Sequence, residues 1–242
     1  MRFKAIILTD TYRHKGLRAQ LVKELRNKGI KDERILKAFE EIPRHYFLDK
    51  AFADWAYRDV PFPIGSDQTI SQPYTVAYQT ELLDIKKGDR VLEIGTGSGF
   101  QACVLAFMGA RVYTIERQEN LFHKTNALLE KIGYSKVRTF FGDGYAGVPR
   151  SAPYDKILIT AGATEVPQTL FDQLVPGGIL VVPLGNNDHQ VMTKYIKKSD
   201  TECQKFTYDN FRFVPFLPGV QKQNSSGNTP DIKSPDRNKV NL

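Results

Sequence analysis

The sequence predicts a doubly wound α/β fold, in which helices cover both faces of a mainly parallel sheet. Five short β-branched runs, from RVLEI to GILVVPLG, alternate with helix-sized segments between residues 89 and 185. A glycine-rich turn follows the first run, as expected where a strand of such a sheet enters a helix. Two longer runs near residues 189–196 and 202–213, joined by a polar turn, predict an antiparallel β-hairpin at the sheet edge.

The composition is that of an ordinary globular protein. The 242 residues are 41% hydrophobic and 25% charged, which indicates one main α/β domain with small additions. No apolar run reaches the roughly 20 residues of a membrane helix, and the N-terminal apolar patch is shorter than a signal-peptide core of about 7–15 residues. We therefore expect a cytoplasmic protein without a membrane partner. Cys103 and Cys203 stand apart, without the spacing of a disulfide framework or zinc module.

The positive charge is concentrated at the N-terminus. The net charge is +7, yet residues 1–50 carry 13 Lys and Arg against 7 Asp and Glu, whereas residues 51–220 carry 17 against 18. A basic helix on a nearly neutral body is typical of a solvated face, so we expect no nucleic-acid partner.

Residues 16–39 have apolar side chains at helical spacing and predict two short helices. Asn27-Lys28-Gly29 closes the first, Asp32 caps the second and Pro43 ends it. A Pro- and Gly-rich connector, residues 60–71, then leads to a helix entered through Pro73. These features divide the chain into an extension (residues 1–70), a main domain (71–220) and a polar tail (221–242) that we expect to be disordered.

The glycine-rich turn reads VLEIGTGSGF and contains Gly95, Gly97 and Gly99. Glycines there let the backbone turn tightly and approach a ligand, although a tight connection alone is the plainer interpretation. A dinucleotide fingerprint would require a third glycine where Phe100 stands, so the NAD pattern is not met.

Carboxylates follow the next two predicted strands. Glu116 ends RVYTIE, where its carboxylate can accept both hydroxyls of a ribose, and Asp143 in GDG is placed to accept from the exocyclic amine of adenine. The alternatives are an exposed strand-end acid and a common Asp-Gly turn. Together with the glycine turn, these residues indicate an adenosine-type ligand at one sheet edge.

With these motifs the sequence resembles the class I S-adenosylmethionine-dependent methyltransferases, with their Rossmann-like sheet. Within them it is similar to the protein-L-isoaspartate O-methyltransferase family over residues 16–219. The most specific element is the loop GSDQTISQPY, similar to the family's Thr-Ile-Ser-x-Pro signature. It is joined by EIGTGSG, GDG, APYDKI, LVPGGILVVPLG and RFVPF.

The resemblance implies methyl transfer from S-adenosylmethionine, which becomes S-adenosylhomocysteine, to the free α-carboxylate of L-isoaspartyl residues in damaged proteins and peptides. The ester then collapses through a succinimide that can reopen to aspartate. A carboxylate with a pKa near 4 is already nucleophilic at neutral pH, so this chemistry requires alignment and exclusion of water rather than a general base or a metal. A monomer is expected, with residues 71–220 as the methyltransferase domain.

The resemblance also implies roles for individual residues. Ser71 is expected to reach the reactive centre and position the substrate carboxylate, with an N-cap for the following helix as the alternative. The residues expected to hold the cofactor are Gln68, Thr69, Ile70, Glu93, Gly95, Gly97, Gly99, Glu116, Asp143 and Gly144. Those expected to form walls around the isoaspartyl residue are Ile64, Gly65, Val214 and Pro215.

The sequence fits five other functions less well. A base-modifying methyltransferase needs Asn/Asp-Pro-Pro-Tyr/Phe where residues 159–164 read ITAGAT, and an arginine methyltransferase needs paired glutamates in a dedicated loop. A small-molecule O-methyltransferase needs a base or metal, and the histidines His14, His45, His123 and His189 are scattered along the chain as structural or surface residues. Fold alone would allow a non-catalytic adenosine-binding protein, but the intact Thr69-Ile70-Ser71 loop argues against it. A dehydrogenase is disfavoured by Phe100 and by the absence of an acid or base for hydride transfer.

Overall fold

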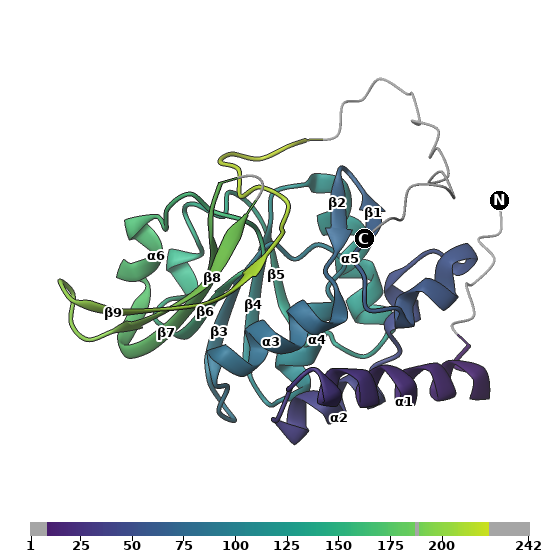
Figure 1. Cartoon of the computed structure of the whole chain (residues 1–242). Coiled ribbons are helices and arrows are strands. Elements are labelled where there is room, and N and C mark those ends of the chain that lie inside the picture. Colours follow the sequence, from purple (N-terminus) through teal and green to yellow (C-terminus); the bar gives the residue numbers. More distant parts are fainter. Residues whose placement is uncertain (1–8, 187–188, 223–242) are drawn as a thin grey trace.

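The structure is a computed structural model that describes residues 9–186 and 189–222. A seven-stranded sheet has the order β5-β4-β3-β6-β7-β8-β9 (Figure 1). Its strands are β3 (Arg90–Ile94), β4 (Arg111–Glu116), β5 (Arg138–Phe141), β6 (Tyr154–Ile159), β7 (Leu174–Gly185), β8 (Gln190–Lys197) and β9 (Cys203–Phe211). The five strands from β3 to β7 are parallel, and β8 and β9 are antiparallel. The predicted parallel sheet and its edge hairpin are confirmed.

The strand order reverses beside β3, which pairs with β4 on one side and β6 on the other. Ile94 near the end of β3 is paired with Ile115 of β4 and with Ile159 of β6, so the three strands end at the same level. The loops that follow them therefore meet above β3. In open α/β sheets such a reversal point is where ligands bind.

Helices and loops cover the two faces of the sheet. The helices are α1 (Tyr12–Asn27), α2 (Glu33–Glu41), η1 (Arg44–Phe47), η2 (Lys50–Tyr57), α3 (Pro73–Leu83), α4 (Phe100–Phe107), α5 (Glu119–Lys131), η3 (Pro149–Ser151) and α6 (Gln168–Asp172). Figure 1 shows α3 and α4 in front of the strands and α1 and α2 along the lower side. On this face Val91, Val112 and Leu158 join the core of α1 to α5. The alternate residues Leu92 and Ile157 pack with α6 on the opposite face.

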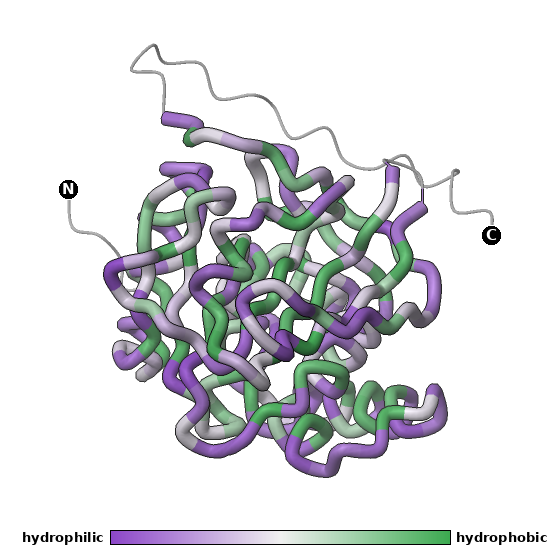
Figure 2. Tube along the Cα trace, turned by 90° about the vertical axis from the view of Figure 1, so that its left-hand side faces the viewer, coloured by the Kyte–Doolittle hydropathy of each residue, from purple (hydrophilic) through white to green (hydrophobic). Residues whose placement is uncertain are grey.

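Hydrophobic stretches run through the interior in Figure 2, while hydrophilic stretches gather in the outer turns. No helix in the described part of the chain is both long and apolar enough to cross a lipid bilayer.

The N-terminal helices form as predicted. Gly29 adopts φ +101° after α1, and Asp32 caps α2 by accepting from the backbone N–H of Arg34. Their apolar side chains, such as Leu25 and Phe39, belong to the same core as α4. The extension is therefore packed onto the sheet rather than appended to it.

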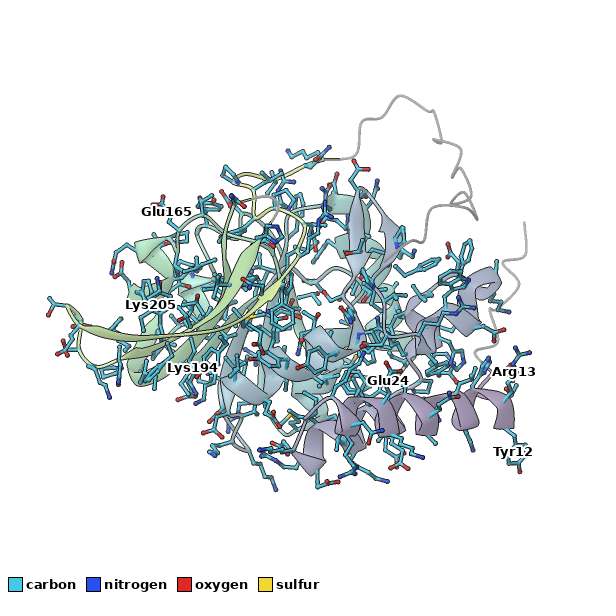
Figure 3. All side chains as sticks on the ribbon, viewed as in Figure 1. Tyr12, Arg13, Glu24, Glu165, Lys194 and Lys205 are labelled. Carbon is cyan, nitrogen blue, oxygen red and sulfur yellow. The ribbon has the colours of Figure 1, made fainter. Side chains whose placement is uncertain are left out.

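Many basic side chains of the extension pair with acids. Arg13 contacts Asp54, Arg26 contacts Glu33, and Lys28 contacts both Glu24 and Asp59. Figure 3 shows Arg13 and Glu24 along α1 at the outside of the molecule. This pairing agrees with the interpretation of the positive charge as a solvated face.

The connector of residues 60–71 differs from the sequence prediction, because it contains a β-hairpin. β1 (Phe62–Gly65) pairs antiparallel with β2 (Gln68–Ile70) through Ser66 and Asp67, which have φ +53° and +54°. Both turn residues are left-handed, as in the type I′ turn that suits a two-residue hairpin. The sequence did not reveal this hairpin, because a Ser-Asp pair is not a strong turn motif and Pro63 is unusual in a strand.

The C-terminal segment, defined here as residues 212–221, crosses the carboxyl ends of the strands (Figure 1). Its backbone pairs with Gly162 after β6 and, at Gln221, with Arg117 and Glu119 after β4. Gln221, which we assigned to the disordered tail, is thus part of the folded chain. The other tail residue described is Lys222, and residues 223–242 lie outside the described residues.

Candidate active site

The turn after β3 brings its backbone close to neighbouring side chains. Gly95 has φ +97°, and a Cβ there would lie 2.6 Å from Thr160 Oγ1. Gly99 has φ +85°, and its Cβ would lie 2.7 Å from Thr125 Cγ2. A larger residue at either position would be strained and would clash, so these glycines are required by the packing of the loop itself.

Glu116 ends β4 directly beside this turn. Its Oε2 accepts from the N–H of Gly97 at 2.8 Å, and its Oε1 accepts from the N–H of Gln118 at 2.9 Å. Burial raises the pKa of this carboxyl above its ordinary value, while these backbone hydrogen bonds favour the ionised form. A carboxylate oxygen has a second lone pair, so both oxygens can still accept from the hydroxyls of a ribose.

A cavity of about 850 Å³, counting the space at its mouth, opens above these loops and is called the inner cavity here. Ten residues predicted from the sequence line it: Gln68, Thr69, Ile70, Ser71, Gly95, Gly97, Glu116, Gly144, Val214 and Pro215. They come from β2 and the residue after it, the loop after β3, the last residue of β4, the loop after β5, and the C-terminal segment. The structure therefore brings together residues that lie up to 147 positions apart in the chain.

Three residues predicted for cofactor binding do not line the inner cavity. Glu93 is fully buried beneath the turn, and Gly99 caps α4. Asp143 accepts from the N–H groups of Tyr145 at 2.9 Å and Gly219 at 2.8 Å. Its carboxylate therefore fastens the C-terminal segment in this structure.

The cavity also has a wall that the sequence reasoning missed. Phe216 lines it, stacks on Tyr145 with ring centroids 4.3 Å apart, and is held by a 2.7 Å hydrogen bond from its N–H to Gly162 O. Phe216 belongs to the RFVPF motif, which was the available signal. The other lining residues not predicted are Val76, Ile94, Thr96, Ser98, Phe100, Gln101, Ile115, Arg117, Thr160, Ala161 and Leu217.

Two observations test whether the cavity suits an adenosine-type cofactor with a charged amino-acid tail. Gly144, Ile94 and Phe216 line the cavity together, and a Cβ at Gly144 would lie 2.5 Å from Ile94 Cγ2 and 2.9 Å from Phe216 Cε2, so the bare backbone packs closely into an apolar wall on which a planar base can lie. Gln101 lines the cavity, and its buried Oε1 has no hydrogen-bond partner among the described residues. A free buried acceptor suits a donor such as an ammonium group. S-adenosylmethionine has both features, so the residues present fit it.

A second hollow of about 1870 Å³, called the outer cleft here, lies beside the inner cavity. Thr69, Ser71, Thr160 and Val214 line both spaces, so Ser71 lies on the boundary between them. The other residues of the outer cleft are Pro61, Gln72, Tyr74, Thr75, Asn186, His189, Asp209, Asn210, Phe211, Arg212 and Phe213. Gln72, not Ser71, is the N-cap of α3, which removes the capping alternative for Ser71.

The predicted substrate walls are found only in part. Val214 lines the outer cleft, and Pro215 lines only the inner cavity. Ile64 and Gly65 do not line the outer cleft: Ile64 faces a separate hollow beside α5, and Gly65 is exposed in the hairpin turn. Both residues belong to the β1–β2 hairpin, which the sequence did not reveal.

The histidines are less scattered than their sequence positions indicated. His14 and His45 stack with ring centroids 3.8 Å apart, and with Asp10 their potential ligand atoms lie within 4.8 Å of one another. Arg18 donates to both carboxylate oxygens of Asp10 at 2.8 and 2.9 Å. A guanidinium in that position opposes a metal cation, so this cluster is better explained as structural.

Comparison with known proteins agrees with this geometry. The family model described as "Protein-L-isoaspartate(D-aspartate) O-methyltransferase (PCMT)" matches residues 16–221. Protein-L-isoaspartate O-methyltransferases of Christiangramia forsetii and Flavobacterium psychrophilum are 58% and 55% identical over 210 residues, covering 87% of this chain and 98% of each relative.

Solved structures show the same fold. A protein-L-isoaspartate O-methyltransferase with 34% identity has a TM-score of 0.76, covering 84% of this chain and 67% of that one. A structure from Plasmodium falciparum, 23% identical, has a TM-score of 0.72 over 84% of this chain and 98% of that one. Because the family match spans the glycine turn, the boundary serine and the C-terminal segment alike, the chain belongs to the protein-L-isoaspartate(D-aspartate) O-methyltransferase family.

Proposed function

We propose that this chain transfers the methyl group of S-adenosylmethionine to the free α-carboxylate of L-isoaspartyl residues in damaged proteins and peptides. The ester that results begins repair through a succinimide. The observation that carries the proposal is the position of Ser71 on the boundary between the inner cavity and the outer cleft. Membership of the family supports the same reaction.

The chemistry places few demands on acid–base residues. S-adenosylmethionine, when bound, supplies a methyl group activated by a sulfonium sulfur. The acceptor carboxylate is ionised at neutral pH, so no side chain has to remove a proton from it. The contribution of the chain is to orient the two reactants and to keep water from the reacting atoms.

The cofactor is proposed to lie in the inner cavity. Glu116 is placed to accept from ribose hydroxyls, and the apolar wall of Ile94, Gly144 and Phe216 is placed to contact the adenine ring. Gln101 offers its free Oε1 to the ammonium group. These groups are already fixed by hydrogen bonds or packing, which lowers the entropy lost on binding.

Ser71 is proposed to position the substrate, not to act as a covalent nucleophile. Its hydroxyl can donate to one carboxylate oxygen of the isoaspartyl residue and leave the other oxygen to react. Thr69 and Thr160 also line both spaces and supply further polar groups at this boundary.

The outer cleft is proposed to hold the peptide around the isoaspartyl residue. Aromatic side chains form part of its wall: Tyr74 and Phe211 have ring centroids 6.4 Å apart, as do Phe211 and Phe213. His189, Asp209 and Arg212 add both signs of charge. A wide cleft of mixed chemistry suits an enzyme that recognises the isoaspartyl backbone within many different sequences.

The test uses two synthetic peptides that differ only in carrying L-isoaspartate or L-aspartate at one position. With labelled S-adenosylmethionine, base-labile methyl ester is expected on the isoaspartyl peptide only. Ser71→Ala is expected to lower methyl transfer far more than affinity for S-adenosylhomocysteine. No ester on either peptide, with S-adenosylhomocysteine still bound, would favour the non-catalytic adenosine-binding interpretation instead.

We also propose that the chain works as a monomer in the cytoplasm, with residues 1–70 as an extension that completes the site and residues 71–220 as the methyltransferase domain. Both cysteines are free, which suits a reducing compartment. The exposed large apolar side chains come from separate elements, among them Tyr12 on α1, Phe107 on α4 and Tyr208 on β9. Light scattering coupled to size-exclusion chromatography tests the monomer, and a dimer mass would contradict it.

A further inference from the structure

Arg44 is buried next to the boundary serine, although arginine is rarely buried in proteins. It is the first residue of η1 and is only 2% exposed. It lines neither the inner cavity nor the outer cleft. A buried cation destabilises a fold unless its contacts compensate, so its position requires an explanation.

The guanidinium of Arg44 joins two walls of the inner cavity. Its Nη2 donates a 2.6 Å hydrogen bond to the backbone carbonyl of Ser71. Its Cζ lies 4.6 Å from the ring centroid of Phe100, the first residue of α4 after the glycine turn. Both Ser71 and Phe100 line the inner cavity. Arg44 therefore connects the loop after β2 to the start of α4, and it does so without lining the cavity itself.

The other end of the same short segment is held by an acid. Asp59 Oδ1 accepts from the N–H of Tyr74 at 2.7 Å, and its Oδ2 accepts from Gln72 Nε2 at 3.1 Å. Gln72 makes no capping hydrogen bond with its side chain, so Asp59 satisfies an N–H at the start of α3 that would otherwise lack a partner. Ser71 thus begins a segment fixed by a cation at one end and an anion at the other.

The charge of Arg44 is kept at neutral pH. Burial lowers its pKa to about 9, and Asp59 and Tyr57 oppose this shift. Its Nε and Nη1 have no hydrogen-bond partner among the described residues. Within the described part of the chain, the carbonyl of Ser71 is therefore the only hydrogen-bond acceptor of this guanidinium, and the Phe100 ring supplies its other favourable contact.

We propose that Arg44 is the positioning residue of Ser71: by holding the Ser71 carbonyl against Phe100, it keeps the Ser71 hydroxyl at the boundary where the substrate carboxylate is oriented. The inference rests on the proposed function of Ser71. Arg44 lines neither hollow and its proposed effect runs through Ser71, so its loss is expected to lower the rate of methyl transfer more than binding of the cofactor.

The test compares Arg44→Met, which keeps an apolar chain without a donor, with Arg44→Lys, which keeps the charge and one donor. Arg44→Met is expected to lower kcat for the isoaspartyl peptide by about 10- to 100-fold, the effect of a small misplacement. Affinity for S-adenosylhomocysteine should change by less than about threefold, because the variant is expected to impair orientation of the substrate and not binding of the cofactor. Arg44→Lys should recover part of kcat.

Arg18→Met is the matched control. Arg18 is also buried, and its Nε also donates to a backbone carbonyl, that of Glu40 at 2.7 Å, but its hydrogen-bond partners Glu40, Asp10 and Tyr57 line neither hollow. If loss of a buried arginine acts only through stability, the two Met variants should lower kcat alike. That result would overturn the inference, whereas a kcat for Arg18→Met within about threefold of the unmodified chain supports it.

A double-mutant cycle with Ser71→Ala decides whether Arg44 acts through the serine. In the Ser71→Ala background, Arg44→Met should lower kcat by less than about threefold, because the hydroxyl it positions is gone. Equal losses in the two backgrounds would overturn this inference alone. Full kcat in Ser71→Ala would overturn the proposed role of Ser71 and this inference with it. If Arg44→Met does not fold, the same cycle with Arg44→Lys gives the answer.

Discussion

The backbone N–H of Gly97 donates a 2.8 Å hydrogen bond to Oε2 of Glu116, which ties the turn after β3 to the end of β4. The second carboxylate oxygen accepts from Gln118 at the start of α5. The carboxylate is therefore fixed by the protein alone, in an orientation that still leaves lone pairs for a ligand.

Glu116→Ala is expected to weaken S-adenosylhomocysteine binding by about 1.5–3 kcal/mol, the scale of charge-assisted hydrogen bonds. The substitution also frees the N–H groups of Gly97 and Gln118, so some of this loss comes from the loop. Isothermal titration calorimetry measures it. Glu165→Ala, an exposed acid away from the inner cavity, serves as the control (Figure 3). Unchanged affinity in Glu116→Ala would remove Glu116 from the cofactor site.

Gly144→Ala is expected to reduce both stability and cofactor affinity. Its Cβ would meet Ile94 Cγ2 at 2.5 Å and Phe216 Cε2 at 2.9 Å, and overpacking of this kind costs about 1–3 kcal/mol. Urea unfolding and calorimetry with S-adenosylhomocysteine give the two readouts. Gly16→Ala is the matched control, since nothing lies within 4 Å of that Cβ. A Gly144→Ala variant that binds and unfolds like the unmodified chain would show that Gly144 is not closely packed against Ile94 and Phe216.

Asp143→Ala is expected to loosen the C-terminal segment. Asp143 Oδ2 accepts from the N–H of Gly219. The alanine variant lacks this hydrogen bond, which holds the segment that includes the cavity-lining residues Phe216 and Leu217. Hydrogen–deuterium exchange without cofactor should become faster in residues 212–221. Affinity of this variant for the cofactor should also fall. Unchanged exchange together with lost affinity would instead indicate a direct contact with the adenine amine, as the sequence predicted.

Glu93 makes stability depend on pH. Burial raises its pKa from 4.5 to about 8, so the folded chain keeps a proton that the unfolded chain releases near pH 4.5. The unfolded state binds fewer protons in this range, and the contribution of Glu93 to stability therefore falls as pH rises from about 4.5 to 8, by up to about 1.4 kcal/mol per pH unit.

Glu93→Gln removes this dependence because the amide is neutral at every pH. The free energy of unfolding of Glu93→Gln, minus that of the unmodified chain, should therefore increase between pH 5 and pH 8 in urea titrations. Glu165→Gln should show no such trend. A constant difference would mean that Glu93 titrates alike in the folded and unfolded chain.

Local patterns in the sequence were sufficient for the main sheet, for most of the helices and for the family. The glycine turn, Glu116 and the Thr-Ile-Ser loop could be recognised because each lies within one short stretch whose backbone geometry dictates residue type. The hairpin of residues 62–70 was missed because its turn pair, Ser66 and Asp67, takes left-handed conformations that the flanking context imposes.

By itself, then, the sequence determined the alternation of strands and helices, the cofactor class and the identity of the boundary serine. Only the tertiary structure decided which side chains meet. It placed Phe216 over the inner cavity, buried Glu93 beneath it and set Arg44 behind Ser71, 27 positions away in the chain. The physical reason is that periodicity and turn chemistry are local, whereas burial and hydrogen-bond partners depend on which distant segments share one core.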